Sequence, residues 1–295
     1  MSARPLHAAL WMMGAVGGFS SMAIAGRQLG GQLDTFEIMA YRSVIGFGIV
    51  LALGWATGAL RSVNSAHLQL HFWRNVFHFT GQNLWFFAVA IIPLAQVIAL
   101  EFTAPILVVL LAPMVLGDRL TRLNVITALI GFCGILIVAR PFGAGALSPG
   151  LIAAALCAWG FAGSILFTRK LTQKGDVTVT CVLFWLTLMQ MVFGFACAGL
   201  DGDMTLPSLP TAGWLVVVGM GGLVAHFCLT TALSLAPPAI VSPIDFVRLP
   251  LIALLGAAIY GEALEWPVLL GAAIIFGANY ANILGLGGRG TAKSA

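Results

Sequence analysis

An internal repeat constrains this chain more than any other feature of its sequence. The segment 92–120 recurs without a gap 144 residues later, as 236–264. The matched positions include Pro93 with Pro237, Gly117 with Gly261, Phe102 with Phe246, Glu101 with Asp245, and Asp118 with Glu262. Leucine matches are common by chance in an apolar chain, but a proline, a glycine and two acids in register are not. The sequence therefore predicts two structurally related halves.

The composition places these halves in a membrane. Hydrophobic residues make up 60% of the 295 residues and charged residues only 8%, against about 25% in soluble domains. Such a chain cannot cover a water-facing surface. The net charge of +4 does not indicate a nucleic-acid partner, because the basic residues lie at the ends of apolar segments. The five cysteines lie in apolar segments without C-x-x-C spacing, so we expect neither a metal site nor a disulfide.

Ten segments are apolar over the roughly 20 residues that a spanning helix needs. We expect helices at 6–26, 35–58, 72–92, 94–116, 121–140, 149–171, 177–199, 211–235, 238–260 and 265–286. The link from Pro141 to Pro149 divides them into two repeats of five, 6–140 and 149–286. The predicted fold class is an all-α integral membrane protein with ten transmembrane helices.

The distribution of lysine and arginine predicts the orientation. With the N-terminus in the cytoplasm, ten basic residues lie inside: Arg4, Arg61, Arg74, Arg119, Arg122, Arg169, Lys170, Lys174, Arg289 and Lys293. Only Arg27 and Arg140 then lie outside, which is a strong positive-inside bias. We expect a multi-pass protein of the inner, cytoplasmic membrane with both termini cytoplasmic. Because five is an odd number, the second repeat must be inverted, as in transporters whose site lies between the repeats.

Four charged residues are predicted within the hydrocarbon. Glu101 and Arg42 lie at similar depths in the fourth and second spans, and Asp245 and Arg248 share one face of the ninth span because they are three residues apart. Intramembrane charges usually face a cavity or a partner. Two interpretations are open: the four line or gate a substrate path, with an acid carrying a coupling proton, or they form structural pairs, Glu101–Arg42 and Asp245–Arg248. Glu37, near the outer end of the second span, is expected to be solvated.

Prolines accompany these charges. Pro105 and Pro250 interrupt the fourth and ninth spans just beyond the charged residues. A proline frees a backbone carbonyl, which a membrane tolerates where the carbonyl faces a cavity or a polar neighbour. The pattern favours a binding site, and a kink used only for packing is the alternative.

The third span adds polar and aromatic residues. His78 and Gln82 are four residues apart and share a face, Trp85 follows, and His226 of the eighth span occupies the repeat position of Gln82. Such groups can stack against and hydrogen-bond a planar substrate. The alternative is hydrogen bonding between helices for the polar groups and lipid contact for the aromatic ring.

Small residues recur at helical spacing in several spans. They include Gly14, Gly17 and Gly18, Gly46 and Gly54, Ala153, Ala154 and Gly160, and Gly219, Gly221 and Gly222. We expect them to let helices approach closely.

Motifs for catalysis are missing from the sequence. It contains no G-x-x-x-x-G-K-[ST], no H-E-x-x-H and no G-x-S-x-G, so we predict no catalytic residues, no cofactor and no enzyme activity.

The chain resembles the drug/metabolite transporter superfamily, in particular its ten-helix EamA-type members. The resemblance is carried by the strings FEIMAYRSVIGFGIVL, IPLAQVIALEFTAPILVVLLAPMVLGD and SPIDFVRLPLIALLGAAIYGE. It implies two EamA repeats and a central cavity that opens alternately to each side, and Arg42 resembles the arginine of the family's second helix. The nearest branch is similar to the S-adenosylmethionine-uptake-like members. Their ninth helix commonly carries a basic residue before an acidic one, whereas here Asp245 precedes Arg248.

The leading hypothesis is a secondary transporter of a small polar or zwitterionic organic metabolite, such as an amino-acid derivative or a nucleoside-like or vitamin-like compound. In this hypothesis the carboxylates of Glu101 and Asp245 bind an amine of the substrate, and Arg42 and Arg248 bind a carboxylate. Transport is by alternating access, and whether it is coupled to protons is left open. The alternatives are a membrane-embedded enzyme or lipid-modifying protein, which would need a catalytic constellation, and a sensor or scaffold, which would not need intramembrane charges. The sequence leaves the substrate, the direction of transport and the oligomeric state undetermined.

Overall fold

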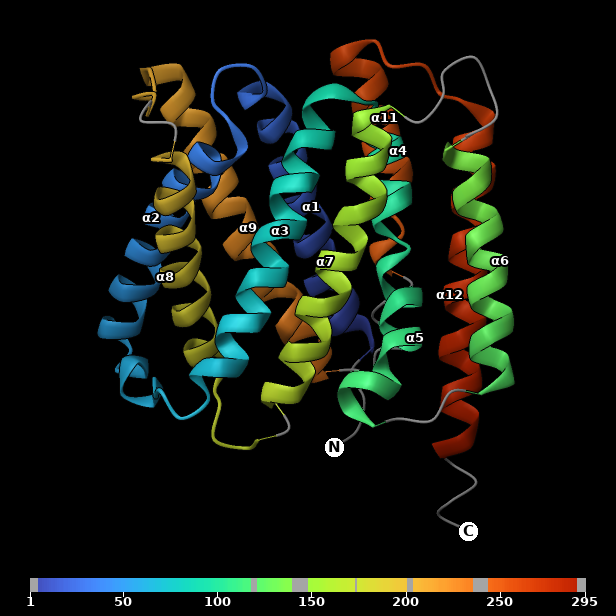
Figure 1. Ribbon diagram of the computed structural model, residues 1–295, viewed down its shortest axis with the longest axis horizontal. Coiled ribbons are helices and arrows are strands. Elements are labelled where there is room, and N and C mark those ends of the chain that lie inside the picture. The colour runs from blue at the N-terminus through green and yellow to red at the C-terminus, as the bar shows by residue number, and fades with distance from the viewer. Residues whose placement is uncertain are drawn as a thin grey trace.

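The computed structural model describes residues 5–117, 121–139, 148–172, 174–200, 204–235 and 244–290, and these are almost entirely helical (Figure 1). The helices are α1 (Pro5–Leu29), α2 (Thr35–Ala56), α3 (Leu68–Ile91), α4 (Leu94–Glu101), α5 (Ala104–Leu116), α6 (Arg122–Ala139), α7 (Pro149–Thr172), α8 (Val179–Ala198), α9 (Leu209–Leu235), α11 (Arg248–Tyr260) and α12 (Trp266–Gly290). A 3₁₀ turn, η1, spans Ala59–Ser62. Within these ranges helices occupy all ten predicted spans, two of which are broken by a turn, and the predicted all-α fold is confirmed.

Several of these helices match a membrane in length and composition. Six segments are long and apolar enough to cross one, and α4 and α5 together form one of the six. Shorter apolar helices occur at 122–138, 248–260 and 266–281. Several predicted features lie outside the described residues: Asp118 and Pro237 of the repeat, the basic residues Arg4, Arg119, Arg140 and Lys293, and most of the link between the halves.

The helix pairing is unchanged when the two halves are exchanged. The most extensive contacts join α1 with α9 and α3 with α7, followed by α2 with α8 and α6 with α12. When the halves are exchanged, α1 takes the place of α7 and α3 takes the place of α9. The α1–α9 contact then becomes the α3–α7 contact, and the α2–α8 and α6–α12 contacts are unchanged. α1 begins at the end of the bundle where α12 finishes, and α7 begins at the opposite end (Figure 1). The packing therefore has the symmetry of inverted repeats.

Glycines bring these four helix pairs close together. A Cβ atom added to Gly160 of α7 would lie 2.5 Å from the Cα atom of Gly81 in α3, and one added to Gly18 of α1 would lie 2.7 Å from the carbonyl oxygen of Gly221 in α9. The same crowding joins Gly194 to Ala40 and Gly134 to Gly271. The predicted role of small residues in close approach is confirmed at Gly18, Gly160 and Gly221, whereas Gly17 has open space around it.

A capping box begins α2 and places Glu37 differently from the prediction. The Asp34 carboxylate accepts hydrogen bonds from the backbone N–H groups of Phe36 and Glu37, and Glu37 accepts one from the Asp34 N–H at 2.9 Å. Glu37 also accepts a bond from the Thr205 N–H, ahead of α9. The expectation of a solvated Glu37 was wrong, because these bonds draw the side chain inward until the residue is 2% exposed.

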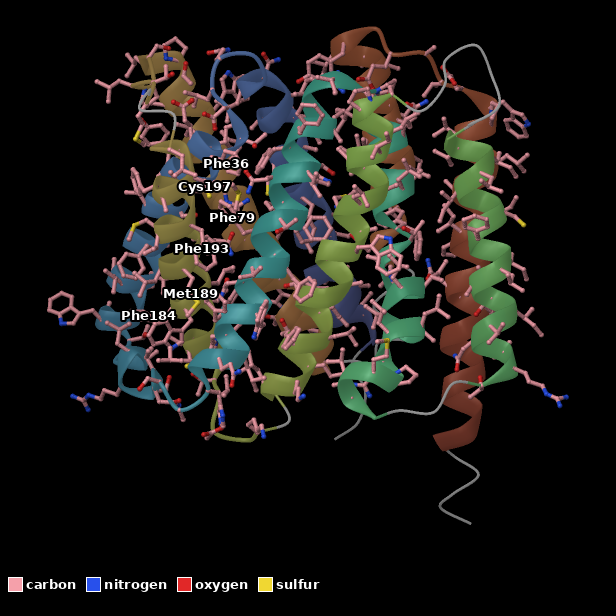
Figure 2. The ribbon with its side chains drawn as sticks, viewed as in Figure 1. Phe36, Phe79, Phe184, Met189, Phe193 and Cys197 are labelled. Carbon is pink, nitrogen blue, oxygen red and sulfur yellow. The ribbon has the colours of Figure 1, made fainter. Side chains whose placement is uncertain are left out.

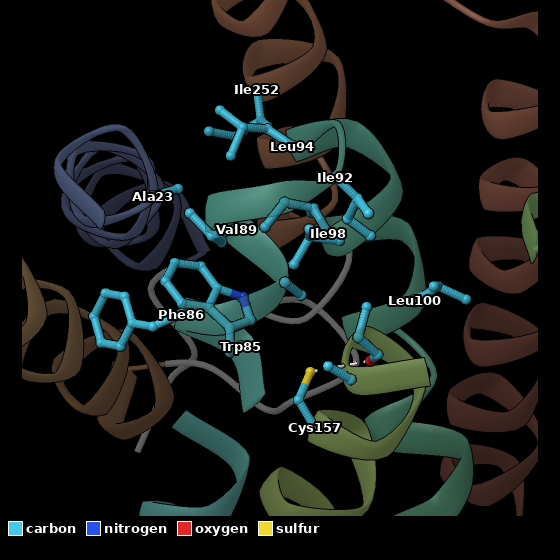
Figure 3. Close-up of a cluster of buried hydrophobic side chains, with 14 of the residues drawn as sticks. Ala23, Trp85, Phe86, Val89, Ile92, Leu94, Ile98, Leu100, Cys157 and Ile252 are labelled. Carbon is cyan, nitrogen blue, oxygen red and sulfur yellow. Dashed lines mark hydrogen bonds between the residues drawn. The ribbon is translucent and has the colours of Figure 1, made fainter. Parts of the chain in front are cut away.

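The core lies where α1, α3, α4, α7 and α11 meet. Figure 3 shows Trp85 and Phe86 of α3 beside Ala23 of α1, with Leu94 of α4 next to Ile252 of α11. Aromatic rings extend this packing toward α2 and α8. Phe79 stacks on Phe36 and meets Phe193 edge-on, with ring centroids 5.9 and 5.7 Å apart (Figure 2). The core thus encloses the part of α3 that carries the predicted polar residues.

Candidate functional site

Breaks in two symmetry-related spans place the charged residues. α4 ends at Glu101 and α5 starts at Ala104, and in the second half a turn at 246–247 precedes α11. Each break lies about one turn before a proline. Because Pro105 and Pro250 have no N–H group, the carbonyls of Glu101 and Phe246 lack the usual partner four residues on, and the Phe246 carbonyl accepts from the Leu249 N–H at 3.1 Å instead. The predicted interruption of both spans is confirmed.

Arg248 joins the two acids into one group, the charged trio Glu101, Asp245 and Arg248. Its Nη2 atom donates to Glu101 Oε1 at 2.9 Å and to Asp245 Oδ2 at 3.3 Å. The guanidinium carbon lies 5.0 Å from the ring centroids of both Phe19 and Phe102. The trio therefore links both halves at the crossing of α4 and α11, with an arginine between aromatic faces.

Trp85 completes the hydrogen bonding of Glu101. Its indole Nε1 donates to Glu101 Oε2 at 2.8 Å, so both carboxylate oxygens of Glu101 have a partner. Asp245 differs, because its Oδ1 atom has no hydrogen-bond partner among the described residues. Within that part of the chain, only Asp245 of the two symmetry-related acids keeps a free oxygen.

One predicted ion pair is present and the other is not. Asp245 and Arg248 pair as expected from their spacing, but Glu101 binds Arg248 and not Arg42. The reason is topological: α4 crosses α11 at the bundle axis, whereas α2 packs mainly along α8. Arg42 instead lies 4.0 Å from the Met22 sulfur and 5.8 Å from the centroid of the Phe86 ring.

The predicted polar residues of α3 and α9 face one another. The rings of His78 and His226 lie 6.0 Å apart, and Phe19 meets His226 edge-on at 5.5 Å. His78 Nε2 and Gln82 Nε2 are buried without a hydrogen-bond partner among the described residues. The rings of Phe19, His78 and His226 therefore meet between α1, α3 and α9, and α3 also carries Gln82.

Arg74 is a buried residue that the sequence analysis placed at the cytoplasmic end of the third span. It lies in the second turn of α3 and is 6% exposed, because the helix begins at Leu68. Its Nε atom donates to Thr168 of α7 at 3.1 Å, and its Nη1 atom has no partner within the described part of the chain. The spacing of four residues between Arg74 and His78 was the available signal, since it puts both on one helix face.

Polar contacts close the bundle at its predicted outer end. Glu262, just after α11, pairs with Arg27 at 2.8 Å and accepts a hydrogen bond at 2.9 Å from the Leu94 N–H, which begins α4. Arg27 also donates to the backbone carbonyls of Val89 and Ile92. These contacts tie α1, α3, α4 and α11 together.

A second set of polar contacts closes the predicted inner end. His67 lies 3.2 Å from Asp176, and the side chain of Asn64 donates to the Asp176 carbonyl at 3.0 Å. Trp185 of α8 donates to the Asn64 carbonyl at 2.8 Å. Here the loop before α3 is tied to the loop before α8, so each end has contacts between the halves.

An inverted-repeat bundle with broken spans and buried charges is an arrangement typical of membrane transporters. The chain belongs to the EamA-like transporter family, whose model matches residues 6–140 and 148–283. It is a multi-pass membrane protein that transports a small metabolite, and it is not an enzyme.

Curated relatives cover nearly the whole chain. A riboflavin transporter of Rhizobium johnstonii is 30% identical over 94% of this chain and 90% of its own length. One of Brucella anthropi is 28% identical, over 91% and 95%. A pseudopaline exporter of Pseudomonas aeruginosa is 27% identical over 73% and 74%. A solved structure of 21% sequence identity covers 94% of the chain with a TM-score of 0.65, which shows the same fold. The resemblance to S-adenosylmethionine-uptake-like members stays a prediction.

Proposed function

We propose that this chain is a secondary transporter of a planar, polar heteroaromatic metabolite of the riboflavin kind, moved by alternating access along the bundle axis. The observation that carries the proposal is the presence of interior rings beside donors that have no partner among the described residues. Trp85 meets Phe86 at 5.2 Å, and a second group of rings, Phe19, His226 and His78, packs between α1, α3 and α9. A flat ring system stacks on such faces, and its carbonyl oxygens and ring nitrogens accept hydrogen bonds from imidazole, amide and guanidinium groups.

In this proposal the predicted site residues divide into two roles. His78, Gln82, His226 and Arg42 contact the substrate. The charged trio, supported by Trp85, gates the path at the crossing of α4 and α11. The hypothesis that Glu101 and Asp245 meet a substrate amine is less favoured, because both carboxylates already accept bonds from Arg248.

Alternating access needs contacts that break at one end while those at the other hold. The Arg27–Glu262 contact supports an outer gate, and the Asp176 contacts with His67 and Asn64 support an inner gate. Release of Glu262 would also free the Leu94 N–H at the start of α4, whose other end carries Glu101. Through α4 the outer gate is connected to the charged trio.

We further propose Asp245 as the coupling-proton carrier, with Glu101 in a supporting role. Asp245 has a buried Oδ1 atom without a partner among the described residues, and its side chain as a whole is 27% exposed, against 16% for Glu101. A proton carrier must exchange protons with water during the cycle. Asp245→Asn should abolish proton-driven accumulation but keep counterflow exchange, and Glu101→Gln should retain part of the accumulation. Equal loss in both variants, or full accumulation in Asp245→Asn, would contradict this assignment.

The proposed location is the inner membrane with cytoplasmic termini. The positive-inside distribution supports it, as does the arrangement in which α1 begins and α12 ends at the same end of the bundle (Figure 1). Single cysteines at 61 and 174 in a cysteine-free background should react only with reagents that enter the cytoplasm. Labelling of either position from outside intact cells would reverse the orientation.

Uptake and binding of riboflavin test the substrate class. Expression should restore growth at low riboflavin to a bacterial strain that neither makes nor imports it, and the purified protein should quench flavin fluorescence on binding. His226→Ala and His78→Ala should weaken both activities, because each removes a stacking face. Failure of growth, uptake and binding in the wild-type chain would reject a flavin-like substrate.

A further inference from the structure

Buried positive charge exceeds buried negative charge along the path that the proposed function describes. Arg248 has two carboxylates, but among the described residues no carboxylate forms an ion pair with Arg42 or Arg74. Both of these arginines are more than nine-tenths buried. A buried charge without a partner is strongly unfavourable, and proteins usually pair or hydrogen-bond such groups.

The contacts of the two arginines leave donors free. Arg42 touches the Met22 sulfur and the Phe86 ring, neither of which balances its charge. Arg74 donates its Nε–H to the Thr168 hydroxyl, while its Nη1 atom has no partner among the residues that the structure describes. Arginine presents five N–H donors in a planar fork, and the fork matches carboxylate and phosphate groups.

His78 lies between the two arginines along α3. Arg74 comes one turn before His78, and the Phe86 ring that Arg42 contacts comes about two turns after it. The His226 ring lies 6.0 Å from that of His78. His78 Nε2 is a further buried nitrogen without a partner in the described ranges. Arg42 comes from α2, Arg74 and His78 from α3, and His226 from α9, so the group spans both halves.

We propose that Arg42, Arg74, His78 and His226 form an anion-binding subsite that takes a carboxylate or phosphate group of the transported molecule. The inference rests on the proposed function and deepens it: the aromatic rings receive the flat part of the substrate and the arginines receive its acidic group. The substrate supplies the negative charge that the protein interior lacks. The charged trio is internally bonded and takes no part in this recognition.

Flavins offer a matched pair of probes, because riboflavin and flavin mononucleotide differ only by a phosphate. Fluorescence titration of the purified full-length chain should give at least about ten-fold tighter binding of the mononucleotide, as expected for charge-assisted hydrogen bonds. Arg42→Gln and Arg74→Gln should each weaken mononucleotide binding about ten-fold more than riboflavin binding. Arg42→Lys should keep most of the preference. Arg61→Gln, an exposed arginine of η1, is the control that should keep all of it.

The outcomes separate this inference from the proposed function. If riboflavin binds as tightly as its phosphate, the anion subsite is overturned and the flavin-like substrate class stands. If neither flavin binds, the flavin-like substrate class is rejected, and the subsite is then tested alone with three indoles: the acid indole-3-acetate, neutral indole and the amine tryptamine. We expect only indole-3-acetate to raise the melting temperature of the purified protein. We expect this increase to be lost in Arg42→Gln and Arg74→Gln. Equal effects of the three compounds, or no arginine-dependent effect of the acid, would overturn the subsite.

Discussion

Arg248 and the pair Arg42 and Arg74 are buried to similar extents, yet their surroundings differ in charge. Arg248 holds two carboxylates, one from each half, whereas the other two hold none among the described residues. The repeat explains part of the contrast: Glu101 and Asp245 are equivalent positions, but the equivalent of Arg248 in the first half is Ala104. One arginine therefore serves both acids at the pseudo-symmetry axis.

The difference separates a structural role from a recognition role. An ion-paired group between α4 and α11 joins the halves, and breaking it leaves buried charge behind. An arginine without a carboxylate contributes little to folding and is available to a solute. Substitution of Arg248 should therefore lower stability, whereas substitution of Arg42 should lower transport.

The largest expected effect is that of Arg248→Gln. The variant leaves Glu101 and Asp245 without a cation, and removal of one partner from a buried charged pair costs about 3–5 kcal/mol. Thermal unfolding in detergent should show a melting temperature far below that of the wild type, with transport lost. Arg61→Gln is the matched exposed control and should stay within about 0.5 kcal/mol of the wild type. Similar melting temperatures for the two variants would remove the proposed structural role of Arg248.

The double exchange Asp245→Arg with Arg248→Asp comes next. The exchange keeps opposite charges at positions 245 and 248 but puts an acid at position 248, next to Glu101. We therefore expect the free energy of unfolding to fall by about 2–3 kcal/mol. The protein should still be inserted and folded, as judged by gel filtration, but should not transport. Restored transport, with both single variants inactive, would show that the pair needs only opposite charges and not Arg248 at its own position.

The sequence predicted the features that depend on local spacing. Apolar segments of spanning length became helices, the breaks fell one turn before Pro105 and Pro250, and Asp245 paired with Arg248 three residues away. The partner of Glu101 was missed because Arg248 is 147 residues away in the chain. That contact depends on which helices cross at the axis, and hydrophobic length does not determine the crossing.

Two further residues were misplaced for a related reason. Arg74 resembled a flanking charge because the apolar run was taken to begin at 72, whereas α3 starts at Leu68 and carries Arg74 inward. Glu37 resembled a solvated residue near a helix end, but the capping box and the Thr205 N–H draw it inward. The surroundings of polar residues near the ends of spans are hard to predict from sequence. A shift of the helix boundary by one turn moves such a side chain from water into the protein interior.

Trp85→Phe should have a smaller effect than either change at Arg248. The phenyl ring keeps much of the packing against Phe86 but removes the 2.8 Å bond to Glu101 Oε2. An unsatisfied buried acceptor costs about 1–3 kcal/mol, and Arg248 still holds the other oxygen, so we expect the lower part of this range. Differential scanning fluorimetry with Glu101→Gln as a second background tests the mechanism. If Trp85→Phe has the same cost in both backgrounds, the indole does not act through the Glu101 carboxylate.

The smallest effect on stability is expected for Arg42→Gln, and it distinguishes the two arginine environments most sharply. Neutralising a buried charge removes its desolvation cost, and no carboxylate among the described residues loses an ion-pair partner. The lost contacts are those with Phe86 and the Met22 sulfur, each worth about 1 kcal/mol or less. The melting temperature should therefore stay near that of the wild type or rise, while transport falls steeply because the substrate loses a donor. A large drop in melting temperature, comparable with that of Arg248→Gln, would show that Arg42 has a structural role like that of Arg248. It would contradict the proposed difference between the two arginines.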